Sequence, residues 1–216
     1  EIVLGIGGLR ALDLLKLRPT VRHINEGHAA FVGLEKIRQF VLEEELTFTE
    51  ARERAAAGNV FTTHTPVPAG HDQFDATLVR AVLGDDRARM LEQAGCLQGA
   101  LNMTQLALRC ARFVNGVAMR HGGVAQDMFP AYPINSITNG VHALTWTSDP
   151  IRALFDQHIP EWRSDNLYLR YAIGIPLDEI RVAHAGAKRE LLKEIKRRSG
   201  LTFDREAFTI GFARRA

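Results

Sequence analysis

Residues 60–71 read Val-Phe-Thr-Thr-His-Thr-Pro-Val-Pro-Ala-Gly-His, and this stretch decides the fold class that we expect. Its first four residues are apolar or β-branched, which is typical of a buried strand. From Thr65 onward, two prolines and a glycine favour a stiff loop over a regular element. Hydroxyl and imidazole groups on such a loop suit the recognition of sugar hydroxyls. Hydrogen bonds to the loop's own backbone explain them equally well.

Two further stretches repeat this pattern of a short strand followed by a polar loop. Residues 21–24 lead into Asn25-Glu26-Gly27-His28, and residues 134–138 lead into Asn139-Gly140. Helical patterns lie between the strands, so we predict an α/β fold with a mainly parallel sheet. The carboxyl ends of parallel strands form the ligand crevice of such folds, although Asn-Gly is first of all a turn signal. Three such loops together indicate a polar cleft.

Apolar spacing predicts the positions of the helices. Thr47 and Glu50 match a capping box at the start of the helix predicted over 46–57. The helix predicted over 101–117 would contain Asn115 and Gly116, which are unfavourable there and indicate close approach to a ligand or to another backbone. We predict a core strand from Thr209 onward. The other predicted helices cover residues 9–17, 29–43, 78–83 and 88–97, and most of 150–198.

Two patterns with chemical meaning fail on their spacing. Gly5-Ile-Gly-Gly is read as a turn between a strand and a helix, because the third glycine of a dinucleotide fingerprint would fall on Arg10. His23 and His28 are five residues apart with Gly27 between them, whereas a helical zinc pair needs a spacing of four. We therefore expect neither a dinucleotide site nor a metal site.

Composition narrows the functional classes. The 216 residues carry a formal net charge of +2, so no basic field points to nucleic acid. No apolar run is long enough to span a membrane, and no signal peptide is visible. Cys96 and Cys110 show no pairing or ligand pattern and are expected in the core, which fits a reducing, cytoplasmic setting. Both termini fall inside predicted structure, so we expect part of a longer protein.

Five motifs in order resemble the α-glucan phosphorylase family, in particular its shorter bacterial and archaeal branch. Four of them begin at His23 (HINEGHAAF), Val60 (VFTTHTPVPAGH), Val114 (VNGVAMRH) and Ile137 (ITNGVH, with Trp146 downstream). The fifth, IGFARR from Ile210, resembles the opening of the family's second domain. The motifs span nearly the whole chain, and five in order are far more specific than any one of them.

The resemblance implies a GT-B glycosyltransferase with two Rossmann-like domains facing each other across a cleft. Residues 1–146 would form the later part of the first domain, and residues 147–216 a helical connection and the first strand of the second. His64 would contact the glucosyl unit at the cleavage point, and Asn139 would hydrogen-bond its 6-hydroxyl. Further residues implied to line or approach the sugar are Asn25, Glu26, His28, Asn115, Gly116 and Val117.

The resemblance also implies an activity in carbohydrate storage metabolism. The family converts α-1,4-glucan or maltodextrin and inorganic phosphate to glucose 1-phosphate, with retention of configuration and with pyridoxal phosphate as cofactor. The cofactor lysine and the basic cluster that holds phosphate belong to parts of the family's sequence that these residues do not match. We therefore expect this chain alone to be inactive. Two alternatives stay open: a non-catalytic glycan-binding remnant, and a GT-B transferase that uses a nucleotide sugar, such as a glycogen synthase.

Overall fold

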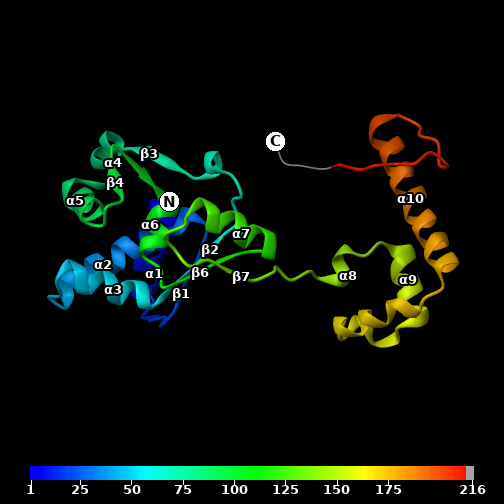
Figure 1. Cartoon of the computed structure of the whole chain (residues 1–216), viewed down its shortest axis with the longest axis horizontal. Coiled ribbons are helices and arrows are strands. Elements are labelled where there is room, and N and C mark those ends of the chain that lie inside the picture. The colour runs from blue at the N-terminus through cyan, green and yellow to red at the C-terminus, as the bar shows by residue number, and fades with distance from the viewer. Residues whose placement is uncertain (213–216) are drawn as a thin grey trace. The chain divides into compact units, whose positions relative to one another are not determined.

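A computed structural model describes residues 1–212 of the chain (Figure 1). The chain divides into two compact units, unit 1 (Glu1–Asn139) and unit 2 (Gly140–Ala216). The division falls a few residues before Trp146, near which the sequence predicts a boundary. Whether the second unit opens a further domain stays a prediction.

A four-stranded parallel sheet organises unit 1 and confirms the predicted α/β class. Its strands lie in the order β1-β2-β6-β7, which is also their order along the chain. Because parallel crossovers are right-handed, this order places the connecting helices on one face of the sheet. The buried side chains of Ile24, Phe61 and Val114 face those helices and form the centre of the core. The strands are β1 (Arg22–Asn25), β2 (Asn59–Thr63), β6 (Phe113–Gly116) and β7 (Asn135–Ser136).

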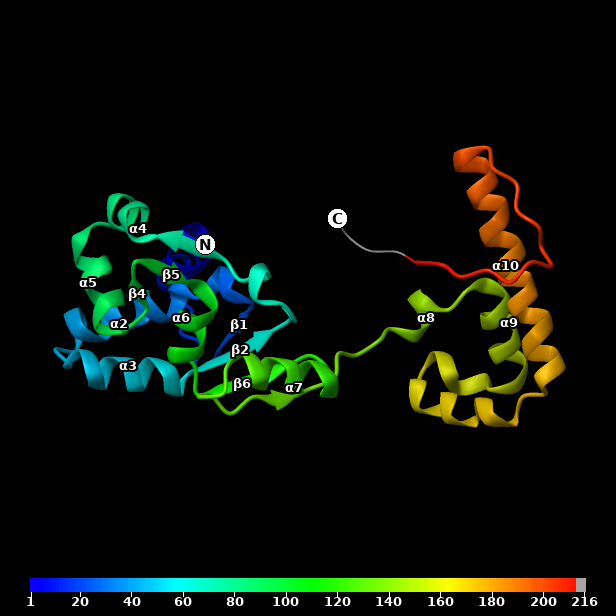
Figure 2. The same cartoon turned by 45° about the horizontal axis from the view of Figure 1, so that its top comes forward.

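Most of the predicted helices of unit 1 are confirmed. Thr47 and Glu50 form the capping box, with each side chain bonding the other residue's backbone N–H. Figure 2 shows α7 running over β6 and β7. The helices are α1 (Gly8–Leu14), α2 (Phe31–Glu43), α3 (Phe48–Ala57), α4 (Ala76–Leu83), α5 (Asp85–Gln93), α6 (Met103–Arg109) and α7 (Met119–Met128), with short turns η2 (Gly27–Ala29) and η3 (Pro68–Gly70).

The expected strand before Gly5 is wrong. Val3–Gly7 forms a π-helical turn (η1) that continues into α1, so the chain is helical before the glycines begin. A Cβ atom at Gly5 would lie 2.7 Å from the Cβ of Phe31. The glycine therefore lets η1 pack closely against α2 and does not turn a strand into a helix.

The single helix predicted over 101–117 is also wrong. Helix α6 ends at Arg109, and Phe113–Gly116 is β6, which pairs with both β2 and β7. Asn115 and Gly116 thus lie in a central strand of the sheet. The poor helix propensity of Asn115 and Gly116 argues against a helix. The apolar spacing on either side of them nevertheless favours one, which explains the error.

A small antiparallel sheet in unit 1 was not predicted from the sequence. Its strands are β3 (Gln73–Asp75), β5 (Ala100–Asn102) and β4 (Leu97–Gln98), paired in that order. Gly99 has a φ of 86° and makes the tight turn between β4 and β5. Strands of two or three residues carry too little periodicity to be recognised in a sequence.

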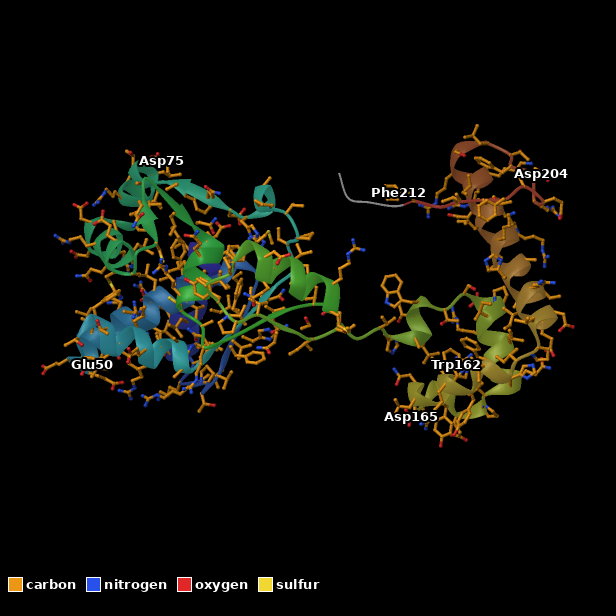
Figure 3. The ribbon with its side chains drawn as sticks, in the orientation of Figure 1. Glu50, Asp75, Trp162, Asp165, Asp204 and Phe212 are labelled. Carbon is orange, nitrogen blue, oxygen red and sulfur yellow. The ribbon has the colours of Figure 1, made fainter. Side chains whose placement is uncertain are left out.

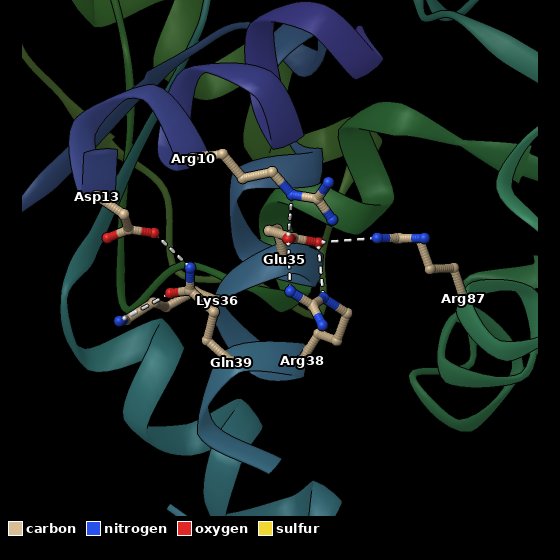
Figure 4. A network of polar contacts seen from close by, with 7 residues as sticks. All are labelled: Arg10, Asp13, Glu35, Lys36, Arg38, Gln39 and Arg87. Carbon is tan, nitrogen blue, oxygen red and sulfur yellow. Dashed lines mark hydrogen bonds and ion pairs between the residues drawn. The ribbon is translucent and has the colours of Figure 1, made fainter. Parts of the chain in front are cut away.

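A buried carboxylate ties the helices of unit 1 together. Glu35 on α2 has a fully buried side chain that accepts hydrogen bonds from Arg10 on α1, at 2.8 Å, and from Arg38, at 2.9 and 3.0 Å. Arg87 on α5 approaches to 3.5 Å, and Figure 4 shows the three guanidinium groups converging on this carboxylate. Burial alone would raise the pKa of Glu35, but the hydrogen bonds from Arg38 and Arg10 outweigh it and lower the pKa.

Unit 2 is helical, as expected for residues 150–198, and packs around Trp162 (Figure 3). Gly200 ends the last helix with a φ of 75°, a left-handed conformation that glycine adopts readily. The strand predicted from Thr209 is wrong for the described residues, since Thr209–Phe212 form no regular element there and Phe212 is exposed. A strand needs a partner to pair with. Ala213–Ala216, at the end of the fifth motif, lie outside the described residues. The helices are α8 (Ala143–Trp146), α9 (Asp149–His158), α10 (Leu177–Ser199), η4 (Pro160–Arg163) and η5 (Asn166–Gly174).

Within residues 1–212, every helix is too short or too polar to serve as a membrane span.

Candidate functional site

Most of the predicted site residues lie along one edge of the parallel sheet. Asn25 ends β1, His64 directly follows β2, and Val117 directly follows β6. Asn139 comes three residues after β7. Because all four strands are parallel, these positions share the carboxyl edge, where α/β proteins bind their ligands. The structure thus brings together segments that are more than one hundred residues apart in the sequence.

His64 is the centre of the contacts at this edge. Its Nε2 atom lies 2.7 Å from Oδ1 of Asn25, and its backbone N–H donates to the carboxylate of Glu26. The hydroxyl of Thr65 donates to the same carboxylate at 3.2 Å. The imidazole is exposed, so the ring is held by its neighbours while remaining accessible.

A polar row crosses the sheet one level below this edge. The register pairs Asn25 with Thr62, Thr62 with Asn115, and Asn115 with Asn135, so these side chains lie on one face. Nε2 of His23 lies 2.7 Å from the Thr62 hydroxyl, which donates to Oδ1 of Asn115 at 2.9 Å. Thr62 and Asn115 are buried. The predicted site residue Asn115 therefore supports the site from inside the sheet.

Backbone hydrogen bonds place Asn139 beside the end of β6. The N–H of Asn139 donates to the carbonyl of Val117 at 3.0 Å, and the N–H of Ile137 donates to Gly116 at 3.0 Å. A Cβ atom at Gly116 would lie 2.6 Å from Nδ1 of His121, so the turn into α7 requires a glycine. The side chain of Asn139 is exposed. It is free to meet a ligand at this edge.

His28 does not join the contacts of His64. Its Nδ1 atom pairs with Asp72 at 2.9 Å and lies 3.8 Å from a carboxylate oxygen of Glu1. One ligand atom from each of these three residues falls within a 4.8 Å cluster. Exposed acidic groups often cluster without a metal ion, and the close contact between Nδ1 of His28 and Asp72 accounts for the arrangement.

Sequence reasoning missed two residues that support the edge. Thr62 joins His23 to Asn115, and only the strand register shows this. His71 is buried, with its Nδ1 atom 2.8 Å from the hydroxyl of Thr104 and its ring edge-on to Phe129. Burial lowers the pKa of His71 against the opposing influence of Glu26 and Asp72. It fixes the far end of the proline-containing loop that begins at His64.

Comparison with curated proteins finds relatives over the whole chain. A maltodextrin phosphorylase of Thermococcus litoralis is 38% identical over 248 aligned residues, covering 100% of this chain and 29% of the relative. A glycogen phosphorylase of Aquifex aeolicus is 31% identical, covering 100% of this chain and 36% of the relative. A glycogen phosphorylase of Mycobacterium tuberculosis is 41% identical, over 68% of this chain and 20% of the relative.

The chain spans about a fifth to a third of the length of these relatives. No protein-family model matches it.

Proposed function

Because this chain belongs to the α-glucan phosphorylase family, we propose that it supplies the sugar subsite of an enzyme that splits α-1,4-glucan with inorganic phosphate. The products are glucose 1-phosphate, with retained configuration, and a shortened glucan. We infer that unit 1 is part of the first Rossmann-like domain of a GT-B transferase. One observation carries the proposal: His64 and Asn139 both follow strands of one parallel sheet and therefore lie at the same carboxyl edge.

His64 and Asn139 are the residues that we assign to the glucosyl unit. A histidine and an asparagine offer both donors and acceptors, which recognition of sugar hydroxyls requires. Both side chains are exposed at the edge, while their backbones are fixed by neighbouring strands. Hydrogen bonds that strengthen as the glycosyl centre becomes oxocarbenium-like would accelerate the reaction.

Pyridoxal phosphate, which the family uses, does not fit the residues of this edge. An amine must bind its aldehyde, and unit 1 contains two lysines, Lys16 and Lys36. Lys16 follows α1, and Nζ of Lys36 bonds Gln39 at 3.1 Å and lies over Phe40. Neither side chain belongs to the edge described above. We therefore propose that the cofactor and the phosphate are held by residues of the complete enzyme outside this edge.

The relatives support a phosphorylase over a synthase that uses a nucleotide sugar, since the three named above are all phosphorylases. A glycan-binding protein without catalysis would bind maltodextrin through this chain alone. We expect the isolated chain to bind maltoheptaose very weakly or not at all, because solvent competes for each hydroxyl at an open edge. Micromolar binding by calorimetric titration would favour the binding protein.

The test is the effect of His64→Ala on phosphorolysis by the full-length product of the gene. We expect kcat/KM to fall about 100-fold or more, as when one preorganised hydrogen-bonding group is removed from an active site. Thermal stability should change little, since the side chain is exposed. The matched control is His184→Ala, because His184 lies exposed on α10, outside this edge. Equal activity of His64→Ala and the wild type would refute the assignment.

A further inference from the structure

His64 is held by two consecutive residues from the neighbouring strand end. Asn25 bonds the ring, at 2.7 Å from Nε2, and Glu26 bonds the backbone N–H of His64. Glu26 also accepts the hydroxyl of Thr65, so one carboxylate holds the first two residues of the loop. Oδ1 of Asn25 and Oε1 of Glu26 are therefore already engaged with groups of the loop that follows β2.

The backbone of Glu26 is in a conformation that a side chain disfavours. Its φ is 64° and its ψ is 173°, a strained region that is almost exclusive to glycine. The N–H of Glu26 nevertheless continues the ladder by donating to the carbonyl of Thr62 at 2.9 Å. Glycine would adopt this turn without strain, so a glutamate at this position needs interactions of its side chain that offset the strain. The hydrogen bonds that the carboxylate accepts from His64 and Thr65 are such interactions.

The contact with Asn25 decides where the proton of a neutral His64 lies. An amide oxygen only accepts hydrogen bonds, so Nε2 must carry the hydrogen. Nδ1 is then left with a free lone pair on the other side of the ring. At the exposed edge, His64 would thus present an acceptor, which suits the O–H of a ligand hydroxyl and not a ligand acceptor.

We propose that Asn25 and Glu26 are positioning residues for His64 rather than ligands of the sugar. Asn25 holds the imidazole as the Nε2–H tautomer, and Glu26 fixes the backbone from which the ring projects. The part of this inference that concerns a ligand rests on the proposed sugar subsite. It adds how the imidazole of His64 is held, which leaves Nδ1 as the hydrogen-bond acceptor at the edge.

The tautomer can be measured on the 216-residue chain without any sugar. Long-range ¹H–¹⁵N correlation spectra, recorded at alkaline pH where an imidazole is neutral, distinguish Nε2–H from Nδ1–H. His64→Gln assigns the ring signals. We expect Nε2–H in the wild type, loss of this preference in Asn25→Ala, and its return in Asn25→Asp, which keeps an oxygen acceptor. His184 provides the internal reference and should not change in any variant.

An Nδ1–H tautomer in the wild type, or an unchanged preference in Asn25→Ala, would overturn the proposal. If Asn25→Ala does not fold, the wild-type spectrum and Asn25→Asp still decide the tautomer. Because no ligand is present, these outcomes are independent of whether the site takes a sugar.

Amide exchange tests the part played by Glu26. The N–H of His64 should exchange faster in Glu26→Gly, which relieves the strain but removes the carboxylate, and Glu26→Gln should restore part of the protection. Equal exchange in the wild type and in Glu26→Gly would refute the role of Glu26.

In the full-length enzyme, Asn25→Ala should lower kcat/KM about 10-fold, the size of one lost hydrogen bond. Asn25→Asp should recover part of that loss. Loss of the tautomer with unchanged phosphorolysis would contradict the acceptor role of His64 and leave the sugar subsite in place.

Discussion

Removing the carboxylate of Glu35 should destabilise unit 1 and leave unit 2 unchanged. In Glu35→Ala, the guanidinium groups of Arg10, Arg38 and Arg87 would converge on a site without a counter-charge. Removing one member of a buried ion pair costs about 3–5 kcal/mol. The three arginine side chains are 50%, 28% and 25% exposed, so water can partly replace the carboxylate. We therefore expect about 3 kcal/mol, the lower end of that range.

Urea unfolding can measure this loss for each unit separately. Both cysteines, Cys96 and Cys110, lie buried in unit 1, and both tryptophans, Trp146 and Trp162, lie in unit 2. Thiol trapping therefore reports unit 1, and tryptophan fluorescence reports unit 2. With a urea m-value of about 2 kcal/mol/M, the midpoint of thiol exposure should fall by about 1.5 M. The fluorescence transition should stay in place.

The charge of Glu35 gives this prediction a pH dependence. The pKa of Glu35 is lowered in the folded state. Its contribution to the free energy of unfolding is therefore complete above the pKa that a glutamate has in the unfolded chain, about 4.3. This contribution is lost as the pH falls through the pKa of Glu35 in the folded state. The difference between wild type and Glu35→Gln should therefore shrink in acid. The control is Glu194→Gln, which removes an exposed partner of Arg197 and Arg198 on α10. A thiol midpoint in Glu35→Ala within error of the wild type would refute the reasoning.

Three further predictions concern the core of unit 1. The pKa of His71 is lowered by burial, so protonation of its ring favours the unfolded chain. The stability of the wild type should drop as the pH falls below about 6.5, and the drop should be smaller in His71→Gln. Denaturation midpoints at pH 5 and 7.5 measure this difference. Burial raises the pKa of Cys96 to about 11 and that of Cys110 to about 12, so a thiol reagent at about pH 8 should label the folded chain far more slowly than the urea-unfolded chain. Gly33→Ala places a Cβ atom 2.5 Å from that of Cys110 and should lower the thermal midpoint by several degrees in calorimetry; an unchanged midpoint would mean that α2 can shift at little cost.

The sequence was sufficient to predict the edge at which the candidate site forms. Residues 60–71 show a buried strand followed by a stiff polar loop, and those local features survive in β2 and the loop after His64. Asn25 is the last residue of one strand, and Asn139 comes shortly after another. Parallel pairing places these ends at one edge of the sheet, so the location of the site follows from local patterns and one topological rule.

Contacts between the strand ends could not be read from the sequence. The bond of Asn25 to His64 and the row through Thr62 and Asn115 depend on register, which no local pattern specifies. The mistaken helix over residues 101–117 has a related cause. Apolar spacing on both sides of Cys110 is compatible with one helix, and only pairing with β2 and β7 decides for a strand. At Gly5, the glycine allows close packing of a helical turn against Phe31, whereas the sequence predicts a turn between a strand and a helix.

The most direct test of the central claim is phosphate-dependent cleavage of maltoheptaose by the full-length product of the gene. We expect α-glucose 1-phosphate to form only when inorganic phosphate is present, and we expect His64→Ala, but not His184→Ala, nearly to abolish this product. Release of free glucose without phosphate, or a strict requirement for a nucleotide sugar, would contradict the account.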